Sequence, residues 1–235
     1  MLKKNLKINF KHNKEPVKLV VMKETYRVSQ ILKTEYAVAF RRAVTMGVAT
    51  RASMTELLKR EAVWSDSDED KLIQKSIEVG ILEIQLAQAQ EEGFEELAKE
   101  IAFKTVKLRS NIYELVQIKH LPMEHTAEAI AEDVRLDNYI TLCTVDAETG
   151  KHYFKDHNDF LARREDKEVE KVYSAVIEEL SRDNIDLLRS LPENKWLMEH
   201  KLIDKDGQAI SDEVVKLLET EEEQEVVVLE EKKAE

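Results

Sequence analysis

Hydrophobic and polar residues alternate along the first twenty residues of the chain. The apolar positions of this alternation are Leu6, Ile8, Phe10, Val17, Leu19 and Val21. Turn-forming residues interrupt the pattern at 12–16, and a period of two on both sides of a turn is typical of a β-hairpin. We therefore predict a small N-terminal β-hairpin, with Tyr26-Arg27-Val28 as a third extended piece.

Apolar residues then follow helical spacing. A helix is predicted from a cap at Ser29 to Gly47, and a shorter one from Thr50 to about Ala62. Between Thr55 and Lys119 the chain contains two further amphipathic stretches, which must cover their apolar stripes by packing on each other or on a partner.

These two stretches predict an antiparallel helical hairpin. Ser65 or Asp66 caps the first helix, which runs to about Glu92, and Gly93 is the hinge. The apolar positions of the first helix are Leu72, Ile73, Ile77, Ile81, Ile84 and Leu86. Those of the return helix are Phe94, Leu97, Ile101, Leu108, Ile112 and Leu115, with heptad-like offsets that suit a shallow crossing.

The C-terminal half is also predicted to be helical. One helix spans about Thr126 to Cys143, and another starts at Asp156 or Asn158 and continues to Pro192. The Asp-Gly pair at 206–207 predicts a short hairpin near 201–210, followed by a last helix from Ser211. Residues 219–235 are almost all acidic or lysine around Val226-Val227-Val228-Leu229, a composition typical of a disordered tail.

The predicted fold is therefore mainly α. It has a small N-terminal β-hairpin, a central antiparallel helical hairpin, a further helical region, a short C-terminal β-hairpin and a disordered acidic tail. The corresponding segments are 1–50, 51–121, 122–218 and 219–235.

The composition of the chain limits the possible functions more than it limits the possible folds. The 235 residues include 48 acidic and 36 basic side chains, so the formal net charge is −12. This charge repels nucleic acid and anionic membranes, and no stretch has the length or apolarity of a signal peptide or a transmembrane helix. With five Gly, three Pro and one Cys, the chain lacks Gly-rich phosphate loops and cysteine-based zinc sites. We expect a cytoplasmic protein, in a host cytoplasm or a virion if the gene belongs to a phage.

Candidate catalytic and metal-binding residues are few. The close histidine pairs, His120 with His125 and His152 with His157, have a spacing of five, which places the rings about 140° apart on a helix. We predict no metal and no cofactor. The alternative left open is an unrecognised enzyme that uses Cys143 as a nucleophile with His152 or His157, because a thiolate needs a neighbouring base.

Large aromatic side chains are the best candidates for partner-binding anchors. These are Trp64, Phe94, Tyr113 and Trp196, on the condition that they are exposed. Two small basic patches, Arg41-Arg42 with Arg51 and Arg163-Arg164, are ordinary helix-surface charges or a site for an acidic partner, of which the acidic tail is one candidate.

Several short motifs resemble small proteins encoded among the tail genes of large contractile-tailed phages. The motifs are Tyr26-Arg27-Val28, Glu35-Tyr36, Phe40, Ala43, Gly47-Val48-Ala49-Thr50-Arg51, Thr126–Arg135, Cys143-Thr144-Val145 and Thr149-Gly150-Lys151, within about residues 20–165. The resemblance implies a tail assembly chaperone, whose helical surfaces hold an aggregation-prone tail component, or a structural protein of the virion.

The function expected from the sequence is therefore a non-catalytic protein–protein interaction module in phage virion or tail assembly. Its partners are other protein chains, such as phage tail components, and the sequence does not set its oligomeric state.

Overall fold

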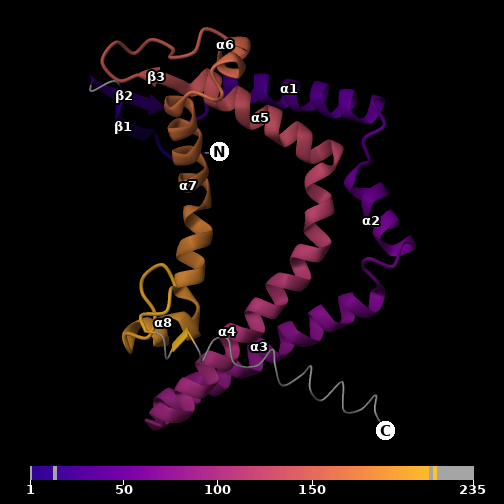
Figure 1. Cartoon of the computed structure of the whole chain (residues 1–235), viewed down its shortest axis with the longest axis vertical. Coiled ribbons are helices and arrows are strands. Elements are labelled where there is room, and N and C mark those ends of the chain that lie inside the picture. Colours follow the sequence, from indigo (N-terminus) through magenta and orange to yellow (C-terminus); the bar gives the residue numbers. More distant parts are fainter. Residues whose placement is uncertain (1, 13–14, 212–213, 216–235) are drawn as a thin grey trace. The chain divides into compact units, whose positions relative to one another are not determined.

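The computed structural model describes residues 2–12, 15–211 and 214–215. The described part is mainly helical, as predicted, with a small antiparallel sheet (Figure 1). Its strands are β1 (Leu6–His12), β2 (Glu15–Val21) and β3 (Thr144–Asp146). Its helices are α1 (Tyr26–Thr45), α2 (Arg51–Arg60), α3 (Asp66–Glu92), α4 (Glu95–His120), the 3-10 helix η1 (Leu121–His125), α5 (Ala127–Cys143), α6 (His157–Ala162), α7 (Lys167–Ser190) and α8 (Pro192–Glu199).

The chain divides into two compact units, and each unit is built from two separate segments. Unit 1 comprises Met1–Ala62 and His120–Asp183, and unit 2 comprises Val63–Lys119 and Asn184–Glu235. This division differs from the four consecutive segments expected from the sequence. The reason is visible in unit 1, where α5 returns to pack along α1 although more than eighty residues separate the two helices.

The predicted N-terminal hairpin of unit 1 is present. β1 and β2 pair in antiparallel fashion from Leu6 opposite Val21 to His12 opposite Glu15. The third strand is β3, which pairs with β2 and places Val21 opposite Thr144. Tyr26-Arg27-Val28 was therefore wrongly predicted as extended: α1 begins there, because the Thr25 side chain, and not that of Ser29, accepts a hydrogen bond from the Val28 N–H (3.3 Å).

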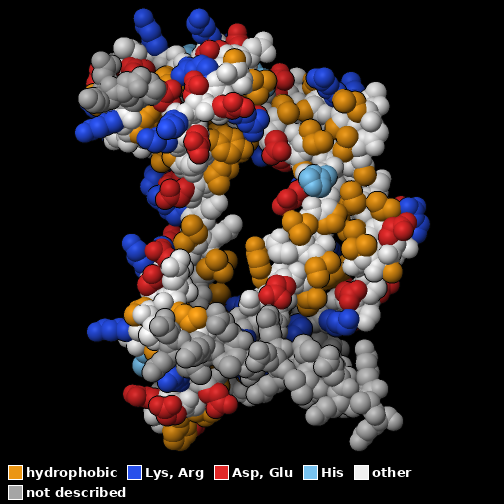
Figure 2. Space-filling view, in the orientation of Figure 1, with side chains coloured by type: hydrophobic (Ala, Val, Ile, Leu, Met, Phe, Trp, Pro, Cys, Tyr) orange, Lys and Arg blue, Asp and Glu red, His pale blue; other side chains and the backbone are white. Residues whose placement is uncertain are grey.

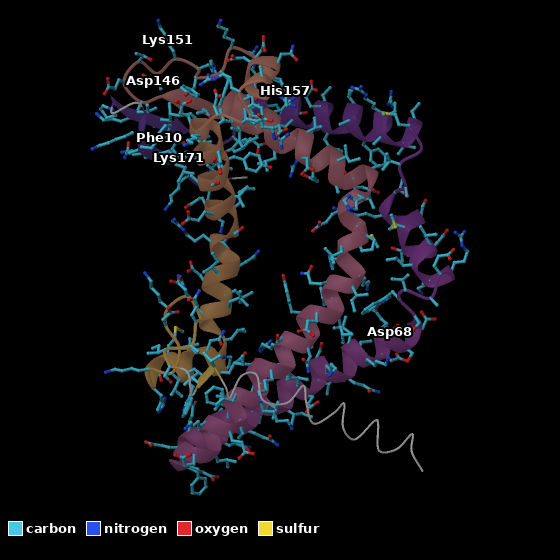
Figure 3. All side chains as sticks on the ribbon, viewed as in Figure 1. Phe10, Asp68, Asp146, Lys151, His157 and Lys171 are labelled. Carbon is cyan, nitrogen blue, oxygen red and sulfur yellow. The ribbon has the colours of Figure 1, made fainter. Side chains whose placement is uncertain are left out.

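The core of unit 1 lies between the sheet and the helices α1, α5, α6 and α7. It consists mainly of buried aliphatic and aromatic side chains, and these are Leu2, Ile8, Leu19, Val21, Leu32, Tyr139, Ile140, Cys143, Phe154, Phe160, Val169, Val172 and Val176. The Tyr139 hydroxyl donates a hydrogen bond to the Met22 carbonyl oxygen (3.0 Å), and this contact joins α5 to the end of β2. At the rim, the Lys171 ammonium lies 5.1 Å from the centre of the Phe10 ring (Figure 3).

The helical hairpin of unit 2 is also present. α3 and α4 run side by side in opposite directions (Figure 1), and a salt bridge between Lys104 and Glu78 (3.4 Å) links them at the surface. The hinge is Gly93, whose φ of 75° lies in the left-handed region that glycine adopts without a steric penalty.

Two predictions near the C-terminal end need correction. The helix expected up to Pro192 is interrupted between α6 and α7, at Arg163–Asp166. The hairpin expected near 201–210 is reduced to a turn closed by one isolated bridge between Ile203 and Ala209. Val214 and Val215 are helical, whereas the rest of the predicted last helix and the acidic tail 219–235 lie outside the described residues.

Candidate protein-binding surface

The start of α3 is defined by a capping box. The Ser65 hydroxyl oxygen accepts a hydrogen bond from the Asp68 N–H (3.3 Å), and the Asp68 carboxylate accepts one from the Ser65 N–H (3.0 Å). The Ser65 hydroxyl also donates to the Asp68 carboxylate (2.6 Å). This hydrogen bond, together with the one from the Ser65 N–H, stabilises the ionised carboxylate and holds the pKa of Asp68 (Figure 3) well below its usual range. Of the two caps predicted from the sequence, Ser65 and Asp66, the structure has Ser65, and Asp66 is the first residue of the helix.

The inner face of α3 forms the core of unit 2. Val79, Leu82, Leu86 and Ala89 are buried and pack with side chains of α4 and with Trp196 and Leu197 of α8. At 100° per residue, the four inner positions of α3 fall within an arc of about 80°. This arc is all that the hairpin itself covers with apolar contacts.

The outer face of α3 is apolar as well. Ile73, Ile77, Ile81 and Ile84, here called the isoleucine stripe, are 51%, 59%, 50% and 62% exposed. They also fall within about 80° of arc, and the centre of this arc lies about 160° from the centre of the inner face. The sequence analysis placed Leu86 and these isoleucines on one stripe. The structure corrects this, because α3 is apolar on two nearly opposite sides.

Gly80 lies within the isoleucine stripe. A Cβ atom added at Gly80 would meet nothing within 4 Å, so no contact among the described residues requires glycine there. Glycine in a helix interior costs about 1 kcal/mol relative to alanine. The outer face of α3 thus combines exposed isoleucines with a glycine that packing within the chain does not explain.

The hairpin tip also exposes apolar side chains, beyond the polar residues Gln88 and Glu91 that follow the isoleucine stripe on the outer face of α3. Phe94, beside the Gly93 hinge, is 54% exposed, and Leu97 in the first turn of α4 is 47% exposed. Figure 2 shows hydrophobic side chains at the surface of this end of the hairpin. Tyr113, further along α4, is 63% exposed. Phe94 and Tyr113 thus meet the condition of exposure that was set for partner-binding anchors.

The two tryptophans do not meet that condition, since Trp64 and Trp196 are each 4% exposed. The Trp64 indole N–H donates to the Glu69 carboxylate (2.8 Å), and the Trp196 ring stacks on His200 with 3.9 Å between ring centroids. Both side chains belong to the packing of unit 2 and are not available as surface anchors. Sequence alone does not separate a core tryptophan from an exposed one.

An ion-pair network holds α3, α4 and α8 together. The Arg109 guanidinium of α4 donates to the carboxylates of Glu83 on α3 and Glu193 on α8. Glu193 is fully buried, and a buried carboxylate left without a charged partner is strongly destabilising. The network fixes the inner face of α3 against its neighbours and leaves the outer face uncovered.

The candidate nucleophile lies in unit 1 and is buried. Cys143 is part of the hydrophobic core, and burial, with a further contribution from the negative charge of Glu24, raises the pKa of its thiol to about 12. A thiol in this environment stays protonated at neutral pH, whereas a nucleophilic cysteine requires the thiolate. Of the two histidines proposed as its base, His152 is exposed and its backbone bridges to Val145, and the His157 ring stacks on Phe160 with 6.1 Å between centroids.

One polar cluster is enclosed in unit 1. Asp137 on α5 is buried, and its Oδ2 atom accepts a hydrogen bond from the Arg164 guanidinium (3.1 Å). Burial raises the pKa of Asp137, and the charges of Arg164 and His157 partly offset this shift. Within the described part of the chain, Asp137 Oδ1 and His157 Nδ1 have no hydrogen-bond partner. The cluster joins α5 to the α6–α7 connection, which is a structural role.

Two kinds of feature can be assessed in the part of the molecule that the structure describes, a metal site and a membrane-spanning helix. No group of three or more His, Cys, Asp or Glu side chains there has the arrangement of a metal site. Among the same residues, no helix combines the length and apolarity needed to cross a membrane.

Comparisons with known proteins add no relative. No protein-family model, no curated protein and no solved structure matches this chain.

Proposed function

We propose that this protein is a non-catalytic binding module that holds another protein chain against the outer face of α3. The observation that carries the proposal is the isoleucine stripe, Ile73, Ile77, Ile81 and Ile84, on the side of α3 opposite to the packed face. Scattered apolar side chains are common on protein surfaces, but a contiguous row of large ones on a helix is typical of an interaction site.

The free energy gained by burying the isoleucine stripe indicates how large the contact with a partner must be. Complete burial of one isoleucine contributes about 1.5–3 kcal/mol, so covering four that are about half exposed contributes about 3–6 kcal/mol in total. Association costs at least about 4 kcal/mol in lost freedom of motion. The stripe alone therefore gives weak binding. A stable complex also needs neighbouring apolar side chains, and Phe94 and Leu97 at the hairpin tip are suitable for this role.

The setting we propose is the assembly of a phage virion or tail. The support is the resemblance of the sequence motifs to small proteins encoded among phage tail genes. In this setting the protein is a tail assembly chaperone, which shields an apolar segment of a tail component until assembly, or it is a structural component that keeps the contact in the particle.

Co-expression tests the proposal. The full chain is produced together with each protein encoded by the neighbouring genes, and the soluble fraction is analysed by size-exclusion chromatography. We expect one of these proteins to be soluble and to co-elute with the chain in a stoichiometric complex. Mass spectrometry of purified particles then distinguishes a structural component, which is retained, from a chaperone, which is not.

A matched pair of variants locates the contact. Ile77→Ser with Ile81→Ser removes two large side chains from the stripe, and Gln74→Ser with Gln85→Ser changes two exposed polar residues on the flank of the same helix. We expect the first variant to lose co-elution and the second to retain it. Equal co-elution of both variants with the partner would contradict a binding site on the outer face of α3.

A further inference from the structure

The outer face of α1, in unit 1, has a different character from the isoleucine stripe. A shallow hollow of about 330 Å³ lies along this helix, and all six residues that line it belong to α1. They are Gln30, Lys33, Thr34, Ala37, Val38 and Arg41. All six are exposed, and they lie on the side of the helix opposite to Leu32 and Ala43, which face the interior.

The hollow has an apolar centre and a cation towards each end. Ala37 is short, so the surface is low at the centre, and beside it the Val38 side chain is 58% exposed. Lys33 and Arg41 are eight residues apart, which is about 12 Å along a helix. Neither of these two cations forms an ion pair with any residue that the structure describes.

The surrounding sequence is basic although the chain as a whole is acidic. Residues 1–62 contain 14 basic and five acidic side chains, a formal charge of +9, whereas the rest of the chain has a formal charge of −21. α1 itself has four basic residues and one acidic residue, Glu35. Figure 2 shows Lys and Arg side chains along the edge of this helix. This face therefore attracts anionic partners.

We propose that the outer face of α1 binds an acidic protein segment in which carboxylates flank a short aliphatic run. An extended chain rises about 3.3 Å per residue, so carboxylates four residues apart lie about 13 Å from each other and carboxylates five residues apart about 16 Å. The first distance is close to the separation of Lys33 and Arg41, and the long side chains of these two residues can reach across the additional length of the second. The aliphatic residues between those carboxylates then cover Val38 and fill the low surface at Ala37. Carboxylate contacts to lysine and arginine set the register of the segment.

Other anionic partners fit this face less well. Nucleic acid binding requires neutralisation of many phosphates along a continuous basic surface. This side of α1 has three cations, Arg27, Lys33 and Arg41, which form no ion pair with the described residues, and Glu35 lies on the same helix. Insertion into a membrane surface requires a wide apolar face with large side chains, and Val38 is the single large aliphatic residue in the hollow.

The sequence of this chain provides a natural probe. Residues 225–230 read Glu-Val-Val-Val-Leu-Glu, which is an aliphatic run between two carboxylates. A fluorescein-labelled peptide of residues 219–235 is titrated with the protein, and binding is followed by fluorescence anisotropy. The protein is the full-length chain with serine at 226–229, so that its own copy of the sequence does not compete.

We expect saturable binding that Lys33→Glu with Arg41→Glu weakens about tenfold. The control variant, Lys151→Glu with Lys155→Glu, makes the same change of charge on exposed lysines of unit 1 outside α1 (Lys151 is labelled in Figure 3) and should change the affinity less than twofold. A peptide with serine at 226–229 and all its glutamates should bind at least fivefold more weakly, because it lacks the aliphatic run. Circular dichroism checks that each variant has the helix content of the parent chain.

Several results would overturn the proposal. These are no binding of the peptide, an equal loss of affinity in both charge-reversal variants, and equal binding of the serine peptide. A duplex oligonucleotide and anionic vesicles are titrated in parallel. If either binds through Lys33 and Arg41 while the peptide does not, the partner belongs to a different class. None of these residues belongs to the isoleucine stripe, so failure here leaves the binding site on α3 untouched.

Discussion

The helices α5 in unit 1 and α3 in unit 2 depart from the usual distribution of residues in opposite ways. α5 buries polar side chains, including Asn138 and Thr141, whereas α3 exposes four isoleucines. These two side chains are satisfied locally: the Asn138 side-chain amide donates to the Val134 carbonyl (2.9 Å), and the Thr141 hydroxyl donates to the Asp137 carbonyl (2.8 Å).

The difference between the two helices is instructive. A buried hydroxyl or amide costs little when a backbone carbonyl of the same helix accepts its hydrogen bond, so burial of Asn138 and Thr141 needs no further explanation. Exposed isoleucines have no such local remedy, because only contact with another apolar surface removes them from water. The buried amide and hydroxyl of α5 are therefore satisfied within the chain, whereas the exposed isoleucines of α3 are the basis of the proposed binding site.

The largest expected effect concerns the packed side of α3. Arg109→Met removes the charge that faces the buried carboxylate of Glu193, so we expect a loss of about 3–5 kcal/mol in the free energy of unfolding. Urea denaturation measures it. The control is Lys104→Met, which breaks the exposed salt bridge to Glu78 and should cost at most about 1 kcal/mol. Equal losses in the two variants would contradict a buried ion pair between Arg109 and Glu193.

The two faces of α3 can be compared by truncating one side chain of equal size on each, Leu86 on the packed face and Ile84 on the outer face. Leu86 is fully buried, so Leu86→Ala should cost about 2–5 kcal/mol in the free energy of unfolding. Ile84 is 62% exposed, and Ile84→Ala should change this free energy by no more than about 0.5 kcal/mol. Chemical denaturation of the isolated chain measures both. A large loss for Ile84→Ala would mean that the outer face is already covered in the free protein.

A smaller change with the opposite sign is expected at Gly80. Alanine has a higher helix propensity, and its Cβ would lie in open space, so Gly80→Ala should stabilise the isolated chain by about 1 kcal/mol. A rise in the thermal midpoint measures this gain. A fall in the midpoint would show that the outer face of α3 is in close contact with another surface in the free protein.

The smallest expected effect is a pH dependence in unit 1. Burial raises the pKa of Asp137 above its ordinary value of 3.8, so the folded state binds this proton more tightly than the unfolded state. The stabilising contribution is complete below pH 3.8 and is lost as the pH rises through the higher pKa of the folded state. In the wild type, the ionisation of Asp137 therefore lowers the free energy of unfolding as the pH rises. Asp137→Asn should lack this part of the pH dependence.

Denaturation of the wild type and of Asp137→Asn at a series of pH values measures this difference. The groups that face Asp137 are Arg164, His157 and Asp133, and they are unchanged in the variant. A difference in stability that does not vary with pH would contradict a raised pKa. A difference that grows with pH in favour of the wild type would reverse the sign of the shift.

The sequence by itself determined the local structure. Alternation with a period of two produces β1 and β2, and helical spacing with a cap at Ser65 and a glycine at 93 produces the helical hairpin. These features depend on interactions between residues that are near one another in the chain, so a single sequence is enough to predict them.

Tertiary structure alone decided which side of each helix is covered. Apolar spacing marks the isoleucines of α3 and Leu86 alike, but only Leu86 meets the residues of α4 and α8. The same holds for Trp64 and Trp196, which are buried, and for Phe94 and Tyr113, which are exposed. Burial depends on contacts between segments far apart in the chain, and these contacts are absent from any local pattern of residues.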